Sequence, residues 1–398
     1  MEQDQYRFLF LEPFFGGSHR DFAEGLVENS RHRIDLLTLP SRFWKWRMRG
    51  AALHFFHKIK NLSQYDGVIT TDLMSLSDFI SLCRGFCPPA LVYFHENQLT
   101  YPLAPGEAMD VHFGFTDITT CLAADRILFN SHTHLQAFFS ALPDFLKRMP
   151  DYRPDWVIDA IRSKTGVLHP GCRFQAKETV AHFPGSDPPL IVWNHRWEFD
   201  KNPEVFFHAL DAIMARGIDF RLALLGENFT NIPEAFTAAR NRYGDRILQY
   251  GYVKSREEYH QWLARGDIVV STACQENFGI SIVEAIRFGC IPILPFRLSY
   301  PEIIPQSFHG DFLYGDLDDL IERLCSVISS RKKYKNKTLS LSREMGRFSW
   351  ESAIRSYDQE LENLLEAGRL RGWPKTTTAT KSLGQGDRTP SSSKVVCF

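Results

Sequence analysis

Short apolar segments that resemble β-strands alternate with helix-like segments along most of this chain, and this alternation limits the possible folds. The first series of strand-like segments comprises Arg7–Phe15, Gly67–Thr70, Ala90–Phe94, Ile127–Phe129 and Thr165–Leu168. The second comprises Leu190–Trp193, Phe220–Leu225, Ile247–Tyr250, Ile268–Ser271 and Ile291–Leu294. Buried, β-branched strands separated by helices predict parallel sheets that are covered by helices on both faces.

A stretch rich in proline, glycine and polar residues, 171–189, separates the two series as a linker would. We therefore predict an α/β chain of two Rossmann-like, doubly wound domains that face a central cleft, with ligands at the carboxyl ends of the strands. The predicted boundaries are 1–183 for an N-terminal acceptor-side domain and 184–347 for a C-terminal donor domain. Residues 348–373 are expected to form a helix that packs back on the N-terminal domain, and 374–398 a disordered tail.

The charge balance restricts the possible partners. Lys and Arg total 46 against 47 Asp and Glu, so a polyanion could be bound only by a local basic segment. The eight cysteines are scattered without a C-x-x-C pair, which suggests reduced thiols rather than a zinc ribbon. The start shows no signal peptide, and no apolar run approaches the ~18 residues of a membrane span. We expect a cytoplasmic protein without membrane insertion.

The strongest constellation is Glu276-Asn277-Phe278-Gly279, which lies between the strand Ile268–Ser271 and a predicted helix. Amides at a helix N-terminus offer a phosphate site. Glu276 could reach hydroxyl groups beside that phosphate, and Glu284, eight positions on, could reach a ribose diol. The alternative is an ordinary loop glutamate and a surface glutamate on a helix.

A second constellation, His195–Lys201, follows the strand Leu190–Trp193. Arg196 and Lys201 could hold both phosphates of a nucleotide diphosphate and stabilise the charge that grows as this group leaves. The alternative is that both cations form solvent-facing ion pairs. The single D-x-D string, Asp316–Asp318, is interpreted as the start of a helix, so we expect no metal.

Two further loops follow strands of the first series. Gly16 and Gly17 lack the spacing of a dinucleotide fingerprint or a P-loop, so they predict either a tight turn or close backbone approach to a ligand. Ser18 and Asp21 suggest a capping box at the start of the next helix. His95 ends the strand Ala90–Phe94, where it is either a structural histidine or a catalytic one.

Two segments offer cations to a polyanion. The first interleaves basic and aromatic residues, which provide phosphate contacts and stacking surfaces; it comprises Arg42, Phe43, Trp44, Lys45, Trp46, Arg47 and Arg49. The alternative is a basic amphipathic helix that packs its tryptophans into the core. The second segment, 331–337, carries five cations and is either a solvated helix end or an additional phosphate-binding site.

With these pieces placed, the sequence resembles the retaining GT-B glycosyltransferases that include glycogen synthases and mannosyltransferases. The resemblance rests on the Gly-Gly loop, the Arg196 and Lys201 pair and the Glu276-x7-Glu284 signature. It also includes Gly226-Glu227, Gly251-Tyr252-Val253, Pro301-Glu302-Ile303 and Gly166–Phe174. The sequence differs at Ser299–Pro301 from the Gly-Gly-x-Pro-Glu pattern that is common in this class.

Several unusual strings resemble more closely the tRNA-queuosine mannosyltransferase family. They are Pro40–Arg47, Tyr93–Leu99, His195–Glu198, Tyr300–Ile303 and Phe348–Trp350. The resemblance implies a hexosyltransferase that moves mannose from GDP-mannose, without a cofactor, to the cyclopentenediol of queuosine in tRNA-Asp, with retention of configuration. No obligate protein partner is evident.

The same resemblance implies roles for individual residues. Glu276 would bind mannose hydroxyls, Glu284 the ribose, and His95 would lie over the sugar. Gly16, Gly17, Asn277, Phe278 and Gly279 would bind the donor together with Arg196 and Lys201.

Three alternatives remain at the level of sequence. One is a related retaining transferase that uses another sugar nucleotide and a lipid or small-molecule acceptor. Another is a tRNA-binding protein without activity, against which the four charged residues Glu276, Glu284, Arg196 and Lys201 argue. The third is a sugar-nucleotide epimerase.

Overall fold

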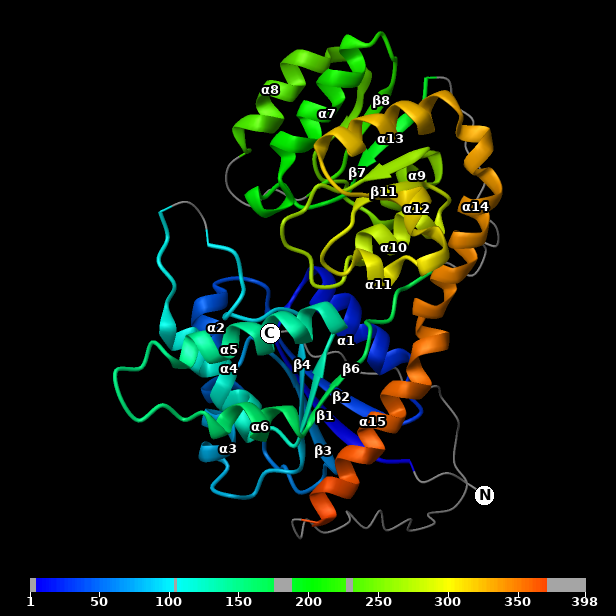
Figure 1. The fold of residues 1–398 in the computed structure, drawn as a ribbon. Helices are drawn as coiled ribbons and strands as arrows, with labels where there is room; N and C mark the ends of the chain where they lie inside the picture. The colour runs from blue at the N-terminus through cyan, green and yellow to red at the C-terminus, as the bar shows by residue number, and fades with distance from the viewer. Residues whose placement is uncertain (1–4, 104–105, 175–187, 227–231, 371–398) are drawn as a thin grey trace, which may run out of the picture.

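The computed structural model describes residues 5–103, 106–174, 188–226 and 232–370, and contains two six-stranded parallel sheets. Figure 1 shows one sheet and its helices below the other, with the end of the described chain running back along the lower one. The expected disordered tail, 374–398, and residues 175–187 of the expected linker lie outside the described residues. The α/β prediction of two parallel sheets is confirmed.

The N-terminal sheet has the strand order β2-β1-β3-β4-β5-β6. Its strands are β1 (Arg7–Phe15), β2 (Arg33–Pro40), β3 (Gly67–Thr71), β4 (Ala90–Phe94), β5 (Arg126–Phe129) and β6 (Thr165–Val167). Its helices are α1 (Gly17–Asn29), α2 (Trp44–Lys58), α3 (Leu76–Leu82), α4 (Val111–Ala123), α5 (His132–Leu146) and α6 (Trp156–Arg162). All strand pairs are parallel, so all carboxyl ends meet at one edge.

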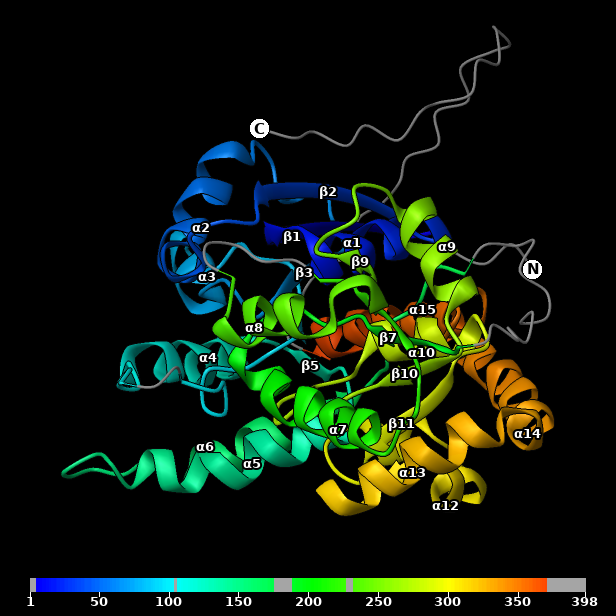
Figure 2. The same cartoon turned by 90° about the horizontal axis from the view of Figure 1, so that it is seen from above.

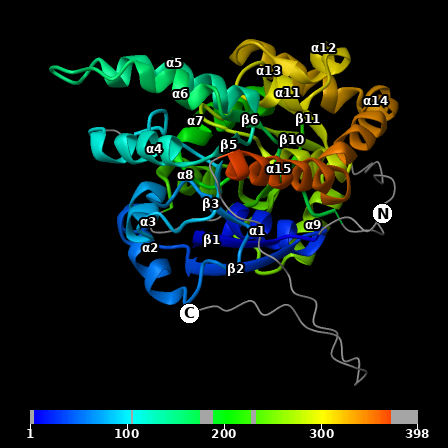
Figure 3. The ribbon, with the colours of Figure 1, turned by 90° about the horizontal axis from the view of Figure 1, so that it is seen from below.

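Alternate residues of the N-terminal strands supply two separate cores, because successive strand side chains point to opposite faces. Leu9 and Leu11 of β1 belong to the core beneath α2 to α6. Phe8 and Phe10 belong to the opposite core, which α1 and the C-terminal helix α15 (Trp350–Leu370) cover. Figure 3 shows α15 crossing this face of the sheet beside α1.

The C-terminal sheet has the order β12-β11-β10-β7-β8-β9. Its strands are β7 (Leu190–Trp193), β8 (Arg221–Leu224), β9 (Ile247–Tyr250), β10 (Ile268–Val270), β11 (Ile291–Pro295) and β12 (Leu313–Tyr314). Its helices are α7 (Pro203–Ala215), α8 (Glu234–Tyr243), α9 (Arg256–Arg265), α10 (Ile280–Arg287), α11 (Tyr300–Ile303), α12 (His309–Phe312), α13 (Leu317–Ser329) and α14 (Arg331–Glu344). Short 3-10 turns are η1 (Phe199–Lys201), η2 (Gly244–Arg246), η3 (Gln306–Phe308) and η4 (Met345–Phe348).

Trp350 joins the returning chain to the N-terminal domain. Its ring is 2% exposed and packs where Gly25 of α1 and Gly171 leave room for it. A Cβ atom on Gly25 would lie 2.0 Å from a Trp350 ring atom, and one on Gly171 would lie 2.3 Å from another. Backbone hydrogen bonds from Cys172 N to Phe348 O (2.6 Å) and from Trp350 N to Cys172 O (3.2 Å) hold the crossing in place.

Three details of the sequence prediction are decided by the structure. The strands β2 and β12 were not predicted; β2 is an edge strand in which Arg33 and Asp35 interrupt the apolar pattern, and β12 has two residues. The capping box at Ser18 is wrong, because α1 begins at Gly17 and no side chain caps it. The helix start at the D-x-D string is confirmed, since the Asp316 side chain accepts a hydrogen bond from Asp319 N.

We expect Trp350→Ala to lower the free energy of unfolding by about 3–5 kcal/mol, because it leaves a cavity where three distant segments meet. Urea denaturation measures this value. Trp46→Ala is the matched control: its ring is 76% exposed, so the change should stay within about 0.5 kcal/mol. Equal stability of the two variants would contradict the packing role of Trp350.

Candidate active site

A cavity of about 510 Å³ lies between the carboxyl ends of the two sheets. The N-terminal domain contributes Gly17, Arg20, Asp21, Glu24 and Arg173; the C-terminal domain contributes Asn194, His195, Arg196, Leu225, Gly226, Tyr252, Val253, Lys254, Ser255, Arg256, Tyr259 and Glu284. Helix α1 lies next to the start of α9 of the other domain, where Arg256 is 2.9 Å from Asp21 (Figure 2). Of the predicted residues, the cavity brings together Gly17, Arg196 and Glu284.

Glu284 lies inside α10 with its side chain toward this cavity. Its two oxygens accept hydrogen bonds from Arg256 (3.0 Å) and from the Tyr259 hydroxyl (3.2 Å). Burial raises the pKa of Glu284 against the opposing effect of Arg256, to about 7. A carboxylate that is oriented in this way is suited to accept hydrogen bonds from a vicinal diol.

Arg256 extends this arrangement to the other domain. Its second guanidinium nitrogen lies 2.9 Å from Asp21 of α1, so one arginine connects both sides of the cavity. Asp21 therefore pairs across the cleft and does not cap its own helix. Sequence reasoning missed Arg256, Tyr259 and Asn194; no motif marks the first two, and Asn194 is identifiable only because it follows the strand β7.

Lys201 occupies a buried position at the end of η1. Its Nζ lies 3.2 Å from Asp200 and 3.5 Å from Glu276, and donates to the Gln275 carbonyl at 2.6 Å. Burial opposes the charge of Lys201, but Glu276 and Asp200 outweigh it and raise its pKa. The alternative interpretation, a solvent-facing ion pair, is therefore wrong for Lys201, which is 7% exposed.

Arg196 is more open, with a side chain that is 44% exposed and 3.2 Å from Glu198. Burial lowers its pKa, but Glu198, Tyr101 and Glu96 together raise it, so the guanidinium stays charged. Arg196 lines the cavity, and Lys201 and Glu276 are not among its lining residues. The charge of Arg196 acts to lower the pKa of Lys201, so the two cations lie within electrostatic reach of each other.

A cluster of ionisable side chains lies in β1, in α1 and directly after β3 and β4 of the N-terminal domain. We call its members, Glu12, His19, Asp72, His95 and Glu96, the N-terminal wall. His95 is 9% exposed and its ring centroid lies 4.1 Å from that of His19. Burial and the charge of His19 hold the pKa of His95 well below its usual value, so its imidazole is neutral.

His19 carries the proton in this group. Its Nδ1 lies 3.3 Å from Glu12. Burial lowers the pKa of His19, but Glu12 and then Asp72 and Glu96 raise it to about 9. A role for His19 could not be predicted from the sequence, because its partner Glu12 lies on the preceding strand.

Glu12, His19 and His95 could also hold a metal ion. They offer one ligand atom each, and these atoms lie within 4.8 Å of one another. A metal would have to displace the proton that His19 holds, since imidazole binds metals in its neutral form. This group is an available ligand set, but the D-x-D string that sequence reasoning considered is not part of it.

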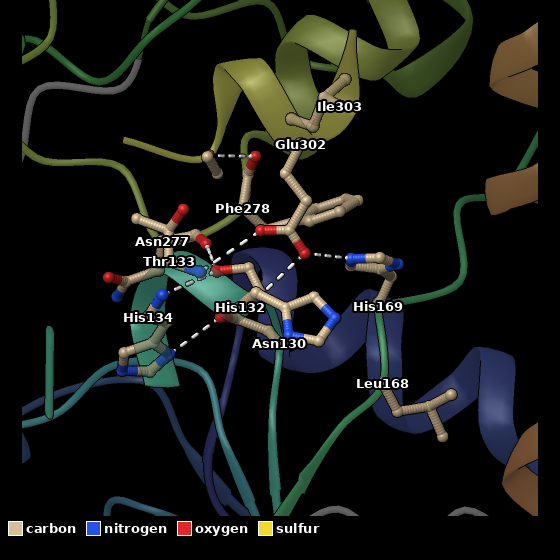
Figure 4. A network of polar contacts seen from close by, with 12 residues as sticks. Asn130, His132, Thr133, His134, Leu168, His169, Asn277, Phe278, Glu302 and Ile303 are labelled. Carbon is tan, nitrogen blue, oxygen red and sulfur yellow. Dashed lines mark hydrogen bonds and ion pairs between the residues drawn. The ribbon is translucent and has the colours of Figure 1, made fainter. Parts of the chain in front are cut away.

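The two domains are joined at the base of the cleft by a network of polar contacts (Figure 4). The Glu302 carboxylate on α11 accepts hydrogen bonds from His132 N (3.0 Å) and Thr133 N (3.3 Å) at the start of α5. A negative charge at a helix N-terminus is favourable. Glu302 also pairs with His169 Nε2 at 2.6 Å.

Asn277 connects the predicted donor loop to the N-terminal wall. Its side-chain amide donates to the His95 carbonyl at 3.0 Å, and its own carbonyl accepts from the Ser131 hydroxyl. Gly279 has φ +97° at the start of α10, a conformation that favours glycine. The Phe278 ring packs against His169 and Phe348, so any donor contact from Phe278 must come from its backbone.

The Gly-Gly turn admits α1 close to the cleft. Gly16 precedes α1, and a Cβ atom there would lie 2.0 Å from the Ser41 hydroxyl. Gly17 has φ +51° and lines the cavity. The structure therefore requires glycine at Gly16 for close approach to the chain at Ser41, and places Gly17 next to a prospective ligand.

The basic–aromatic segment forms the start of α2, on the N-terminal domain. Phe43 and Trp46 are 68% and 76% exposed, whereas Trp44 packs on Phe113 with ring centroids 5.2 Å apart. The exposed cations of the segment are Arg42, Lys45 and Arg49. Arg47 is partly covered and points its guanidinium at the Pro40 carbonyl (3.4 Å). Trp44 thus packs against the core, as the alternative interpretation predicted, whereas Trp46 is exposed.

The second basic segment, 331–337, forms the first two turns of α14, at the far end of the C-terminal domain from α2 (Figure 1). Lys337 pairs with Asp311 at 2.5 Å. This segment is part of a helix, and the structure places it away from the basic–aromatic segment. Glu227 of the Gly226-Glu227 pair lies outside the described residues.

The raised pKa of Glu284 predicts a pH dependence for binding of a nucleotide donor. Below pH 7 the carboxyl is protonated and accepts hydrogen bonds from a diol less well, so kcat/KM for the donor should fall about tenfold from pH 8 to pH 6. Glu284→Gln should show a lower value that does not vary over this range. A flat profile for the unchanged protein would contradict the assignment.

Comparisons with known proteins agree with this geometry. Residues 7–172 match the family described as tRNA-queuosine alpha-mannosyltransferase N-terminal, and residues 175–338 match Glycosyl transferases group 1. Among solved structures, sucrose-phosphate synthase from Thermosynechococcus elongatus superposes with a TM-score of 0.68 at 16% identity, covering 92% of this chain and 100% of that one. The catalytic domain of starch synthase IV from Arabidopsis thaliana gives 0.66 at 13% identity, covering 91% and 100%. The fold is therefore GT-B.

Proteins with similar sequences identify the family more narrowly than the similar structures do. A glycogen synthase from Novosphingobium aromaticivorans is 28% identical over 30% of this chain and 24% of its own length. The tRNA-queuosine alpha-mannosyltransferase of Drosophila melanogaster is 36% identical over 331 residues, which cover 79% of this chain and 85% of that protein. This chain belongs to the tRNA-queuosine alpha-mannosyltransferase family.

Proposed function

We propose that this protein transfers mannose from GDP-mannose to the cyclopentenediol of queuosine in tRNA-Asp, with retention of the α configuration. The observation that carries the proposal is the 36% identity to the Drosophila enzyme across both domains. The site supports it. Arg196 and Glu284 line the cavity between the domains, Lys201 lies within electrostatic reach of Arg196, and Asn277 bonds to the carbonyl of the neutral His95 of the other domain.

In this proposal, the diphosphate of the donor binds between Arg196 and Lys201, and its ribose diol binds Glu284 in place of Arg256. As the bond from the sugar to the phosphate breaks, negative charge grows on the leaving oxygen, and two pre-positioned cations stabilise it. The departing phosphate takes the proton of the acceptor hydroxyl, which attacks from the same face. No nucleophile from the protein is required.

The other contacts to the donor are inferred from where the remaining site residues lie. Glu276 lies 3.5 Å from Lys201 and so is placed to accept hydrogen bonds from sugar hydroxyls next to the diphosphate. The neutral His95 can hydrogen-bond a sugar hydroxyl without placing a positive charge beside the developing oxocarbenium. Asn277, Gly279 and the Gly16-Gly17 turn complete the proposed donor site.

We further propose that the reaction uses no resident metal, since the two cations already supply positive charge at the diphosphate. Cytoplasmic activity is part of the same proposal; the cysteines of the described ranges are free thiols, as is usual in reducing compartments. Among the described residues, no helix combines the length and apolar character that crossing a bilayer requires.

The proposed tRNA contact surface is the start of α2 with the residues before it. No aspartate or glutamate occurs between Asp35 and Asp66, so this surface carries its positive charge without nearby acids from its own segment. Arg42, Lys45, Arg47 and Arg49 would bind phosphates, and the exposed Trp46 would offer a stacking surface with the edge of Trp44.

The deciding experiment presents a panel of radiolabelled sugar nucleotides to the protein with queuosine-containing or queuosine-free tRNA, with and without EDTA. Label should appear only from GDP-mannose, only on queuosine-containing tRNA, and equally in EDTA. Lys201→Ala should abolish transfer while its thermal melting stays cooperative. Transfer to a lipid, isomerised donor without tRNA, or label on queuosine-free tRNA would overturn the proposal.

Binding of tRNA should weaken steeply with salt, because each neutralised phosphate releases counterions. Replacing Arg49 by alanine should reduce the slope of log K against log salt by about 1, and Arg42→Ala should act similarly. Filter binding from 50 to 200 mM salt measures this slope. Lys337→Ala, on the distant α14, is the control and should leave it unchanged; a salt-independent wild type would contradict the surface.

A further inference from the structure

The N-terminal wall carries an excess of carboxylates that the proposed reaction does not explain. Both substrates are polyanions, and a wall that faces them would ordinarily be neutral or positive. Glu12, Asp72 and Glu96 nevertheless lie there with one protonated partner, His19. The partners of these carboxyl groups therefore decide what this side of the cleft can bind.

Glu96 is the member of the wall best placed to meet such a group. It follows His95 directly and is half-buried. Its backbone neighbours are fixed: His95 N donates to Asp72 at 2.8 Å, and the Asn97 side chain accepts from Leu99 N and Thr100 N at 3.0 Å. Within the part of the chain that the structure describes, the Glu96 carboxylate has no hydrogen-bond or ion-pair partner.

The charges around Glu96 define its surroundings. Burial, together with Asp200, raises the pKa of Glu96 above its usual value, against the opposing charges of His19 on its own side and of Arg196 and Lys201 across the cleft. In the donor complex, the two cations across the cleft are engaged by the diphosphate. Glu96 then faces a bound anion, with only His19, already shared with Glu12, to balance its charge.

A second, independent observation points the same way. The second carboxylate oxygens of Glu12 and Asp72 are buried, at 0% and 2% residue exposure, and have no partner among the described residues. Burial and the nearby Glu96 raise the pKa of Asp72 against the opposing charge of His19, to about 8. Unpartnered buried oxygens next to Glu96 indicate hydrogen-bonding capacity that the described residues leave unused.

We propose that Glu96 is a specificity-determining residue that binds the protonated secondary amine of queuosine. This inference rests on the proposed function. In queuosine, that amine joins the cyclopentenediol to the base, so it lies within a few bonds of the hydroxyls that accept mannose. An amine held by Glu96 keeps the diol beside His95, the adjacent residue, where the donor sugar is expected.

The pairing also explains how one modified nucleoside is selected. Unmodified guanosine has neither the diol nor the ammonium group, so it would leave Glu96 unpaired in a partly desolvated site. A ligand without the ammonium group leaves the partly buried Glu96 charge unpaired, and it therefore binds much more weakly than a ligand that has this group. The pairing also predicts that the donor binds before the tRNA. Once the donor occupies Arg196 and Lys201, Glu96 has the greatest need of the ammonium group of queuosine.

The test measures steady-state kinetics of Glu96→Gln with queuosine-containing tRNA and GDP-mannose. We expect at least a tenfold rise in KM for the tRNA, with KM for the donor within twofold of wild type. The direction of the change in KM for the tRNA is diagnostic, because removing a negative charge from the protein would otherwise strengthen its binding of a polyanion. Glu322→Gln, a matched change on the exposed face of α13, should leave both values unchanged.

A second arm does not depend on the variant folding. Wild-type protein is given a tRNA analogue in which an ether oxygen replaces the secondary amine of queuosine. This substrate should lose about the same factor as Glu96→Gln does, and the two changes together should cost little more than either alone. Glu96→Asp should recover part of the affinity for the natural acceptor.

Two results would overturn the inference while leaving the proposed function intact. One is equal use of the amine and ether acceptors by wild-type protein; the other is an unchanged tRNA KM in Glu96→Gln. If wild-type protein instead fails to mannosylate queuosine-containing tRNA at all, the proposed function itself is wrong, and the two failures are therefore distinguishable.

Discussion

The hydrogen bonds that Asn277 of the C-terminal domain makes across the cleft, to His95 and Ser131 of the N-terminal domain, are the contacts on which the rest of the site depends. The donor loop belongs to one domain and His95 to the other, and Asn277 is bonded to the backbone beside His95 and to Ser131. Because Glu302 caps α5 in the same network, the relative position of the domains is set within hydrogen-bond tolerances. A site that is divided between two domains needs such a constraint, since catalysis depends on sub-ångström placement.

Charged groups of both domains gather around the cleft. Cations gather on the C-terminal side at Arg196 and Lys201, while the opposite wall carries carboxylates around His19. Within the low dielectric of a partly closed cleft these fields act more strongly than in water. Arg256, which pairs with Asp21 of one domain and Glu284 of the other, is the clearest such charged contact.

Much of the fold could be predicted from the sequence because its central strands are buried on both faces and therefore read as continuous apolar runs. The strand β2 could not, since an edge strand alternates with charged residues such as Arg33 and Asp35. Position along the chain likewise indicated three site residues. Arg196 and Lys201 follow a strand, and Glu284 lies in the helix that follows another. Arg256, whose partners Asp21 and Glu284 lie on different domains, leaves no local pattern, and neither does the partner of Glu302 at the start of α5.

The packing of Trp350 between Gly25 and Gly171 has a consequence for the order of folding on the ribosome. One face of the N-terminal sheet is completed by Trp350, Tyr357, Leu361 and Leu364, which are synthesised after the entire C-terminal sheet. Until those residues leave the exit tunnel, Phe8, Phe10 and Phe22 remain without their cover. The nascent N-terminal half must therefore wait with an apolar face exposed, a period in which a holding chaperone would protect it from aggregation.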